Sequence, residues 1–534
     1  MSICNRIILW TIIALGLPQC AAGATWYAAS DGDATNGSYV QPWSIWYAAT
    51  NGNPYLAGGD TVIFKNGSFK STAYYPDPYT ISNSFMWYAS GTEAENITYR
   101  SESLWGFTFQ CGLLIPAGTS NLCFWGLRVS IPEIVTRNKT NAWEMPAGFS
   151  VNGSNVSLLH NLVENCGQPG IWSGNDDLGK YFAGNVVRFV GYYDWSLTGG
   201  IQYDGDDRGE GFYLENLETP ALIVGNIVYC NLTGGMLLKN GVEDFRLTNN
   251  IIAETKSHGI LFQQKHDPCE GVNIVSNFVF MGMPSGPGVT MGNDLYADGW
   301  NGTNANVFGN YIVGHLKGLS LRAHWQDIAV SNNIICRLGL YGDGSSDQAT
   351  EYNTISVEAS AATNSPTYRF GGNAYYSPSD LAWNYSTYGN SGLDEFTNTT
   401  SDVSSSYSNA LPTGLDVFVV QPSSDSNFVH VAVFNWQTNA SASIDLSDYF
   451  DVGSRLIVYD SQNVPTAYTN LTYNGDDLLL PLTLTNRAEM LGEFTSWTSS
   501  WTGFDPRFRA FVVYRGEPIS AQLGQGTLGT GVYQ

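Results

Sequence analysis

Along the middle of the chain, apolar residues alternate with polar ones in short runs and do not follow the spacing of a helix. One recurrent pattern is a polar or small residue, an asparagine and two apolar residues, as in "GNIV" at Asn226 and "NNII" at Asn250. Another is a glycine followed by alternating apolar positions, as in "GFYLE" from Gly211 and "GMLLK" from Gly235. A period of two predicts β-strands that bury one face.

The two patterns recur in turn along the chain. The asparagine pattern occurs at Asn161, Asn185, Asn226, Asn250, Asn277, Asn310, Asn333 and, more weakly, Asn373, and the glycine pattern at Gly170, Gly211, Gly235, Gly259, Gly288 and Gly318. The period is about 24 residues with insertions, which leaves no room for a helix, whereas a propeller blade needs about 40. The leucine-rich consensus is absent. The repeat therefore predicts an all-β parallel β-helix, in which each coil stacks on the next.

Alternation also predicts the two faces of the glycine strand. The first and third residues after glycine are expected to point inward: Phe212 and Leu214, Met236 and Leu238, Ile260 and Phe262, Val289 and Met291, Leu319 and Leu321. The second and fourth residues then point outward. The fifth residue is Asn175, Asn216, Asn240, Gln264, Asn293 or Ala323. We interpret these amides as a structural ladder at a turn, not as ligands.

The segment Thr25–Phe69, "TWYAASDGDATNGSYVQPWSIWYAAT…LAGGDTVIFKNGSF", resembles the opening of secreted right-handed parallel β-helix proteins of the pectate-lyase-like superfamily. "NLCFWGLRVS", from Asn121 to Ser130, resembles an early coil of the same proteins. The resemblance covers roughly Thr25 to Asp380, and it implies a short helix that caps the first coil. It is specific for fold only, since this fold carries lyases, hydrolases, epimerases and proteins without activity.

Composition divides the chain further. Arg6, the apolar run Ile7–Leu17 and Ala22-Gly23-Ala24 predict a signal peptide over residues 1–24, hence a secreted or, in a bacterium, periplasmic product without a membrane anchor. The predicted domains are a β-helix over 25–395, a Ser/Thr-rich linker over 396–414, a β-sandwich-like domain over 415–518 and a tail over 519–534. The sandwich is expected either to pack on the helix or to bind sugar.

Charge and cysteines narrow the partners. The net charge of −24 excludes binding to nucleic acid through a general positive field, so an anionic substrate needs a local basic patch or a bridging cation. We expect a monomer that acts on a polysaccharide. Export permits disulfides, and Cys111 and Cys123 are the expected pair. Cys166, Cys230 and Cys336 are expected to be buried thiols.

The candidate chemistry lies on the outward rows of the glycine strands. Glu215, Lys239 and Gln263 form one row on adjacent coils, and Arg322 lies three coils beyond Lys239, about 14 Å away at the usual strand spacing. A second row carries Lys265, Asp294 and His324. Nearby insertions add the aromatic residues Trp195, Tyr203, Tyr296 and Trp300, on which sugars can stack. They also add Asp204, Asp206 and Asp207, whose oxygens suit Ca²⁺.

Two segments resemble the alginate lyase/chondroitinase B family. "GLSLRAH", Gly318–His324, is similar to its arginine strand, and "LLKNGVEDFRLTNNII", Leu237–Ile252, to its lysine strand. The resemblance implies β-elimination on a uronic-acid polysaccharide, with Lys239 as base and Arg322 as acid or carboxylate clamp. In that family the two strands are adjacent, but here two coils intervene. Arg322 then either acts with Lys265, Asp294 and His324 or binds a distant subsite.

Three other interpretations stay open. A glycoside hydrolase needs paired carboxylates, and its candidates are Glu215, Asp294, Asp204, Asp206, Asp207 and Glu210. A non-catalytic β-helix that adheres to glycans needs none of this chemistry. Basic residues at outward positions can also be merely solvated, but the clustering of Lys239, Lys256, Lys265, Lys317 and Arg322 in an acidic chain favours a site.

Overall fold

The protein is described from a computed structural model. It describes residues 23–33, 36–50, 53–71, 84–131, 146–174, 179–191, 209–215, 217, 221–231, 233–239, 241, 243–255, 258–263, 269–281, 289–291, 302–314, 317–321, 327–338, 353–357, 368–377, 383–384, 402, 404–422, 425–483 and 505–516. Within these residues, no helix is long and apolar enough to cross a membrane.

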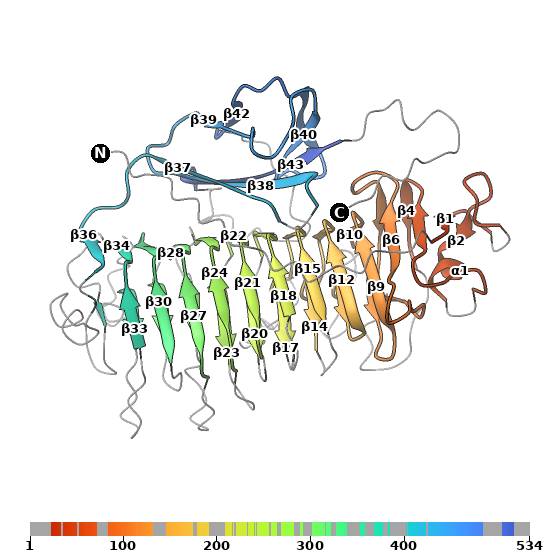
Figure 1. Ribbon diagram of the computed structural model, residues 1–534, viewed down its shortest axis with the longest axis horizontal. Coiled ribbons are helices and arrows are strands. Elements are labelled where there is room, and N and C mark those ends of the chain that lie inside the picture. Colours follow the sequence, from red (N-terminus) through yellow and green to blue (C-terminus); the bar gives the residue numbers. More distant parts are fainter. Residues whose placement is uncertain are drawn as a thin grey trace, which may run out of the picture.

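Three long parallel sheets form the body of the molecule (Figure 1). Sheet A has the strand order β2 (Trp43–Ser44), β1 (Thr25–Ala29), β3 (Thr61–Phe64), β6 (Ile97–Ser101), β9 (Ser120–Trp125), β12 (Ser154–Leu159), β15 (Lys180–Ala183), β18 (Ala221–Val224), β21 (Arg246–Thr248), β24 (Asn273–Val275), β27 (Ala305–Phe308), β30 (Ile328–Ser331) and β33 (Tyr368–Gly371).

Sheet B has the order β4 (Gly67–Phe69), β7 (Phe107–Phe109), β10 (Arg128–Ser130), β13 (Leu162–Glu164), β16 (Val186–Arg188), β19 (Ile227–Tyr229), β22 (Ile251–Ala253), β25 (Phe278–Phe280), β28 (Tyr311–Gly314), β31 (Ile334–Arg337), β34 (Ala374–Tyr376) and β36 (Ser406–Ser408). Sheet C has the order β5 (Ser84–Met86), β8 (Gly112–Ile115), β11 (Phe149–Val151), β14 (Ile171–Ser173), β17 (Phe212–Glu215), β20 (Gly234–Lys239), β23 (His258–Gln263), β26 (Val289–Met291), β29 (Lys317–Leu321), β32 (Asn353–Val357) and β35 (Trp383–Asn384).

The chain passes through sheets A, B and C in turn, so that each coil pairs in parallel with the coil before and after it. For example, β12, β13 and β14 pair with β15, β16 and β17. This topology confirms the predicted parallel β-helix. Parallel crossover connections of this kind are almost always right-handed, in keeping with the resemblance.

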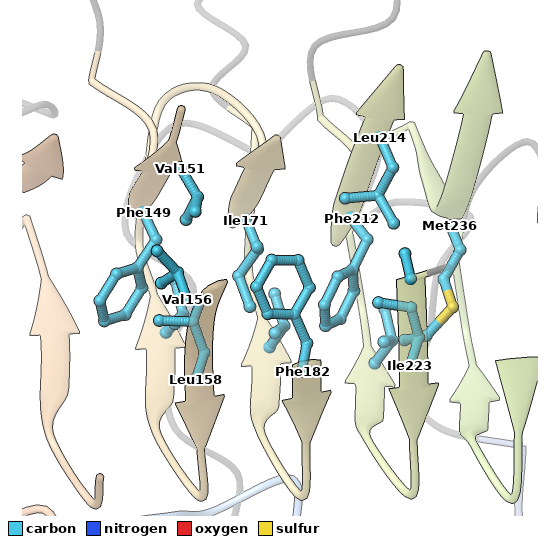
Figure 2. Packing of buried hydrophobic residues seen from close by; sticks show 14 of the residues in the cluster. Phe149, Val151, Val156, Leu158, Ile171, Phe182, Phe212, Leu214, Ile223 and Met236 are labelled. Carbon is cyan, nitrogen blue, oxygen red and sulfur yellow. The ribbon is translucent and has the colours of Figure 1, made fainter. Parts of the chain in front are cut away.

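The core lies between the three sheets. Figure 2 shows Phe149, Ile171 and Phe212 from sheet C facing Leu158 and Phe182 from sheet A. The predicted inward positions Phe212, Leu214, Met236, Leu238, Ile260, Phe262, Leu319 and Leu321 are all fully buried, while the side chains of Val289 and Met291 lie outside the described part. The predicted alternation of faces is therefore confirmed.

The asparagine pattern has a local physical cause. It marks the turn from sheet A to sheet B, where the residue before the asparagine adopts a left-handed backbone, with φ of 59° at Gly225 and 57° at Asn249. The asparagine that follows forms a buried ladder: Asn226 Nδ2 donates to Asn250 Oδ1 at 2.9 Å and to the Phe182 carbonyl at 2.9 Å. The amide ladder predicted at the fifth position of the other pattern lies outside the described residues.

The glycine pattern follows from crowding between sheets B and C. A Cβ on Gly170 would lie 2.3 Å from Val187 Cγ1, and one on Gly235 would lie 2.3 Å from the Gly259 carbonyl oxygen. Real Cβ atoms do not approach so closely, so a larger residue would have to push two coils apart.

The predicted capping helix is confirmed as α1 (Ile45–Ala49) at the N-terminal end of the stack (Figure 1). The Ser44 hydroxyl caps it by accepting from the Tyr47 N–H at 3.2 Å. Tyr99 then fastens α1 to the next coils, because its hydroxyl donates to the Ala48 carbonyl at 3.0 Å. The helix covers the end of the core, where strand edges would otherwise be open.

An antiparallel domain follows the β-helix, as predicted. Its larger sheet has the order β37 (Leu415–Val420), β38 (Phe428–Asn435), β43 (Phe508–Arg515), β40 (Arg455–Asp460) and β41 (Ala467–Thr472), and β39 (Ser441–Ile444) pairs with β42 (Leu478–Pro481). One boundary differs: β36 pairs with β34, so the last described strand of the β-helix lies inside the segment predicted as linker.

The C-terminal domain packs on the outward face of sheet B (Figure 1). Phe280 stacks on Phe508 with ring centroids 5.2 Å apart, and Tyr311 stacks on Phe434 at 3.9 Å. The fully buried Arg188 reaches across the interface and donates to the carbonyls of Gln462, at 2.7 Å, and Val464. Of the two roles considered for this domain, packing is the one the structure displays.

The predicted disulfide is wrong. Cys111 and Cys123 are both buried and form no disulfide, and the same holds for Cys166, Cys230, Cys269 and Cys336. Cys111 lies in the core, whereas Cys123 lies on β9 between the inward residues Leu122 and Phe124. Alternation therefore turns Cys123 to the outside of sheet A, away from Cys111. Burial raises the pKa of Cys111 to about 12.

Candidate active site on the outward face of sheet C

Sheet C presents an outward face that differs in chemistry from that of sheet B. The C-terminal domain covers sheet B. On sheet C, three successive strands, β14, β17 and β20, place Trp172, Tyr213, Glu215 and Lys239 at outward positions, all of them partly buried. Partial burial lowers the local dielectric and strengthens the electrostatic interactions between such groups.

A hydrogen-bonded chain links three of these residues. The Lys239 ammonium donates to the Tyr213 hydroxyl oxygen at 3.1 Å. The Tyr213 hydroxyl in turn donates to Glu215 Oε2 at 3.0 Å. Lys239 Nζ also lies 5.4 Å from the centre of the Tyr213 ring. A cation, a phenol and a carboxylate are thus held in one relay.

Strand geometry accounts for this relay. Tyr213 and Glu215 are two residues apart on β17 and so share a face. Glu215 and Lys239 are register partners on β17 and β20. Inward Phe212, Leu214 and Leu238 fix both strands in the core. The relay therefore stands on a rigid element and not on a loop.

Trp172 extends the site toward the N-terminal end. It is the register partner of Tyr213 on the preceding coil. A Cβ on Gly174 would lie 2.8 Å from the Trp172 ring and 3.4 Å from Glu215 Cγ. Glycine at this position thus leaves room for both side chains. An indole beside the relay offers a flat apolar surface of the kind that suits a sugar ring.

Most of the predicted site residues belong to segments other than the described ones. Arg322, Lys265, His324 and Asp294, the aromatic residues Trp195, Tyr203, Tyr296 and Trp300, and Asp204, Asp206 and Asp207 all lie outside the described residues. Gln263 ends β23 as the register partner of Lys239, but its side chain is not described. Of the predicted catalytic residues, Glu215 and Lys239 are brought together.

The spacing between Lys239 and the arginine strand is as predicted. β20 pairs with β23, β23 with β26, and β26 with β29, the strand that ends at Leu321. Two strands therefore separate the lysine strand from the strand that precedes Arg322. The pairing expected from the alginate lyase/chondroitinase B resemblance, on adjacent coils, is not present here.

Sequence reasoning missed Tyr213 and Trp172. Both occupy the second position after glycine, in "GFYLE" and "GIWSG", and that position was assigned outward. Large aromatic side chains at an outward position of two successive coils were the available signal.

The described residues offer no obvious metal site. Among them, no three His, Cys, Asp or Glu side chains gather closely enough to hold a metal ion. The acidic loop with Asp204, Asp206 and Asp207 lies outside this part of the chain, so the predicted Ca²⁺ site stays a prediction.

Two other buried titratable groups, Glu254 and His160, belong to the domain interface, whereas the buried His258 lies on β23 of sheet C, where burial lowers its pKa to about 4. Burial, together with the charge of Asp505, raises the pKa of Glu254 to about 8. Burial lowers the pKa of His160 to about 3, and His160 stacks on Phe428 of the C-terminal domain with ring centroids 3.7 Å apart. Strongly shifted pKa values often mark functional sites, but those of Glu254 and His160 accompany the docking of the two domains.

Comparison with known proteins gives a distant likeness only. No protein-family model matches the chain, and no curated protein matches it. The structure titled "The complex structure of XylC with xylose" aligns over 85% of this chain and 95% of its own, with 8% identity and a TM-score of 0.39. The PL6 family polysaccharide lyase Pedsa3628 from Pseudopedobacter saltans aligns over 69% and 90%, with 12% identity and a TM-score of 0.34.

The periplasmic alginate epimerase AlgG aligns over 66% of this chain and 77% of its own, with 10% identity and a TM-score of 0.31. Likenesses of this size do not assign an activity. The candidate site is therefore judged on its own residues.

Proposed function

We propose that the chain is a secreted polysaccharide lyase that cleaves a uronic-acid-containing polymer by β-elimination on the outward face of sheet C. The observation that supports this most is the relay from Lys239 through Tyr213 to Glu215. β-Elimination needs positive charge near the uronate carboxylate, a group that takes the C5 proton and a proton for the departing O4. An ammonium, a phenol and a carboxylate in contact provide groups of these kinds.

The scarcity of carboxylates on the described strands of sheet C favours elimination over hydrolysis. A glycoside hydrolase uses two carboxyl groups, about 5 Å apart for retention or about 6.5–9.5 Å apart for inversion. On the described strands of sheet C, Glu215 is the one Asp or Glu residue. The register partner of Glu215 on the next strand is Lys239, a cation and not a second carboxylate.

We propose the remaining predicted residues, which lie outside the described part of the chain, as subsites of the same surface. We assign Arg322 to a distant subsite, since two strands separate its coil from that of Lys239. Lys265, Asp294 and His324 then belong to the same extended surface. The aromatic residues of the two insertions are candidates for stacking on flanking sugars.

Incubation with alginate, pectate and glycosaminoglycans tests the proposal. Reducing ends and the ultraviolet absorbance of C4=C5 unsaturated products are recorded together. A lyase produces both signals from at least one polymer. Reducing ends without absorbance would show hydrolysis instead, and binding without either signal would show a non-catalytic protein.

A variant connects the activity to the site. Lys239→Ala is expected to reduce the rate of product formation by about 10²–10⁴-fold, the usual contribution of a proton-transfer or charge-stabilising group. Lys65→Ala, at an exposed hydrogen-bonding lysine on the N-terminal coils, is the matched control and is expected to keep the wild-type rate. Equal rates for Lys239→Ala and wild type would remove sheet C as the active site.

A further inference from the structure

The direction of the two hydrogen bonds distinguishes the roles of Lys239 and Tyr213. An ammonium group can only donate hydrogen bonds. Lys239 donates to the Tyr213 oxygen, and that hydroxyl donates onward to Glu215. The phenol oxygen therefore lies between a cation that stabilises a developing phenolate and a carboxylate that can accept the phenol proton.

We infer that Tyr213, and not Lys239, is the catalytic residue that takes the C5 proton of a bound uronate, and that Lys239 and Glu215 tune its phenol. This inference rests on the proposed function and deepens it. The resemblance to a known lyase family assigned the base to the lysine, and only the geometry of the relay points to the tyrosine.

The proposed step balances without any further reactant. As the Tyr213 oxygen takes the C5 proton, the phenol proton moves to Glu215. The electron pair of the C5–H bond forms the C4=C5 double bond, and the C4–O4 bond breaks with its electrons on O4. Tyr213 gives a proton to O4, and Glu215 returns its own to Tyr213. The products are an unsaturated uronate and a shortened chain with a free hydroxyl.

The position of Tyr213 also removes the difficulty with Arg322. An acid that protonates O4 must lie close to the base at C5, because the two atoms belong to one glycosidic linkage. Two strands separate the coils of Lys239 and Arg322. One phenol beside Lys239 can serve both atoms in turn when they present the same face of the sugar.

Kinetics of the full chain on whichever polymer it cleaves test the inference. Tyr213→Phe removes one oxygen and keeps the ring, and it is expected to lower kcat by at least about 10²-fold with little change in KM. Tyr181→Phe, at a partly buried tyrosine on sheet A, is the control and is expected to match wild type. Thermal unfolding confirms that both variants are folded.

Two pH profiles test the supporting roles. Lys239→Met removes the cation that stabilises the phenolate, so the rise of kcat with pH is expected to move to higher pH. Incorporation of difluorotyrosine at position 213, whose phenol is more acidic, is expected to move it to lower pH without disturbing the fold. A lysine that merely holds the strand in place would lower the rate without moving the profile.

Each outcome is decisive. Unsaturated products from wild type and full activity in Tyr213→Phe would overturn the inference and leave the proposed function standing. Loss of activity in Lys239→Met with an unmoved profile would show that Lys239 does not tune the Tyr213 phenol and would overturn that part of the inference. Absence of unsaturated products from the wild-type protein on all three polymers would overturn the proposed function and the inference together.

Discussion

Single side chains hold neighbouring coils together in this protein, and Asn250 is an example. Its Nδ2 donates to Asn277 Oδ1 and to the Ile223 carbonyl, both at 2.9 Å. Its Oδ1 accepts from the backbone N–H and the Nδ2 of Asn226 at 2.9 Å each. All these groups are buried, so a missing partner cannot be replaced by bulk water.

Asn250→Ala is therefore expected to destabilise the fold by about 2–4 kcal/mol, since it leaves several buried polar groups unpaired. Urea unfolding measures the change. Asn249→Gly, at the left-handed position next to it, is the control and is expected to have little effect because glycine adopts this backbone freely. A ladder that contributes little to stability would give equal values for the two variants.

At the scale of the strands, the pattern of the sequence carried most of the information. Alternation predicted that Phe212, Leu214, Met236 and Leu238 all point inward. In a strand with one buried face, a shift by one residue would turn every apolar side chain to the outside. The same reasoning assigned Tyr213 outward but gave it no role. Its role depends on a contact with Lys239, which lies on the next coil. Such a contact depends on how neighbouring coils align, and the spacing of residues along the sequence does not predict that alignment.

The disulfide prediction failed at the same scale. Cys111 and Cys123 are near in sequence, but one lies in the core and the other at an outward position of a strand. A short distance between two residues in the sequence does not show that their side chains lie on the same face. The alternation of inward and outward positions along each strand has to be followed as well. The insertions that carry Arg322 and the predicted aromatic residues have no repeat to fix their geometry, so their arrangement could not be derived from pattern.

The glycine positions give a prediction for the strands of sheet C. Gly170→Ala is expected to destabilise the fold by about 1–3 kcal/mol or more, because its Cβ would meet Val187 Cγ1 at 2.3 Å. Gly371→Ala, where the nearest atom is the Ser404 hydroxyl at 3.1 Å, is the control. Thermal unfolding compares the two. Equal midpoints would show that the glycine pattern has a cause other than crowding.

The whole molecule is a rod with a second domain fixed along one side, and the docking contacts are buried and charged. Glu164 accepts from Arg128 at 2.8 Å and from Arg188 at 2.7 Å. Arg188 continues into the C-terminal domain. This domain therefore covers sheet B, and the proposed site lies on sheet C.

Arg188→Leu is expected to destabilise the docked state by about 3–5 kcal/mol, because it removes one partner of a buried ion pair and the donor to carbonyls of the second domain. Calorimetry is expected to show a lower transition temperature or a separate transition for the C-terminal domain. Arg246→Leu, at an exposed arginine on sheet A, is the control. An unchanged thermogram would show that Arg188 does not hold the domains together.

Glu254 makes the docked molecule sensitive to pH. Burial and the charge of Asp505 raise its pKa from 4.5 to about 8, so between these values the unfolded chain releases a proton that the folded chain keeps. Stability is then expected to fall as pH rises from about 4.5 to about 8, by at most about 1.4 kcal/mol per pH unit. Unfolding of Glu254→Gln across this range is expected to lack this component. Parallel curves for the two proteins would contradict it.

The mass of the products tests the central claim most directly. Oligosaccharides released from a uronic-acid polymer by elimination on sheet C carry a C4=C5 double bond, so each cleavage gives a fragment lighter by one water than hydrolysis would give. Mass spectrometry of a digest by the wild-type protein is expected to show these unsaturated fragments, and the same digest by Tyr213→Phe is expected to show almost none. Saturated fragments from the wild-type protein would contradict the account.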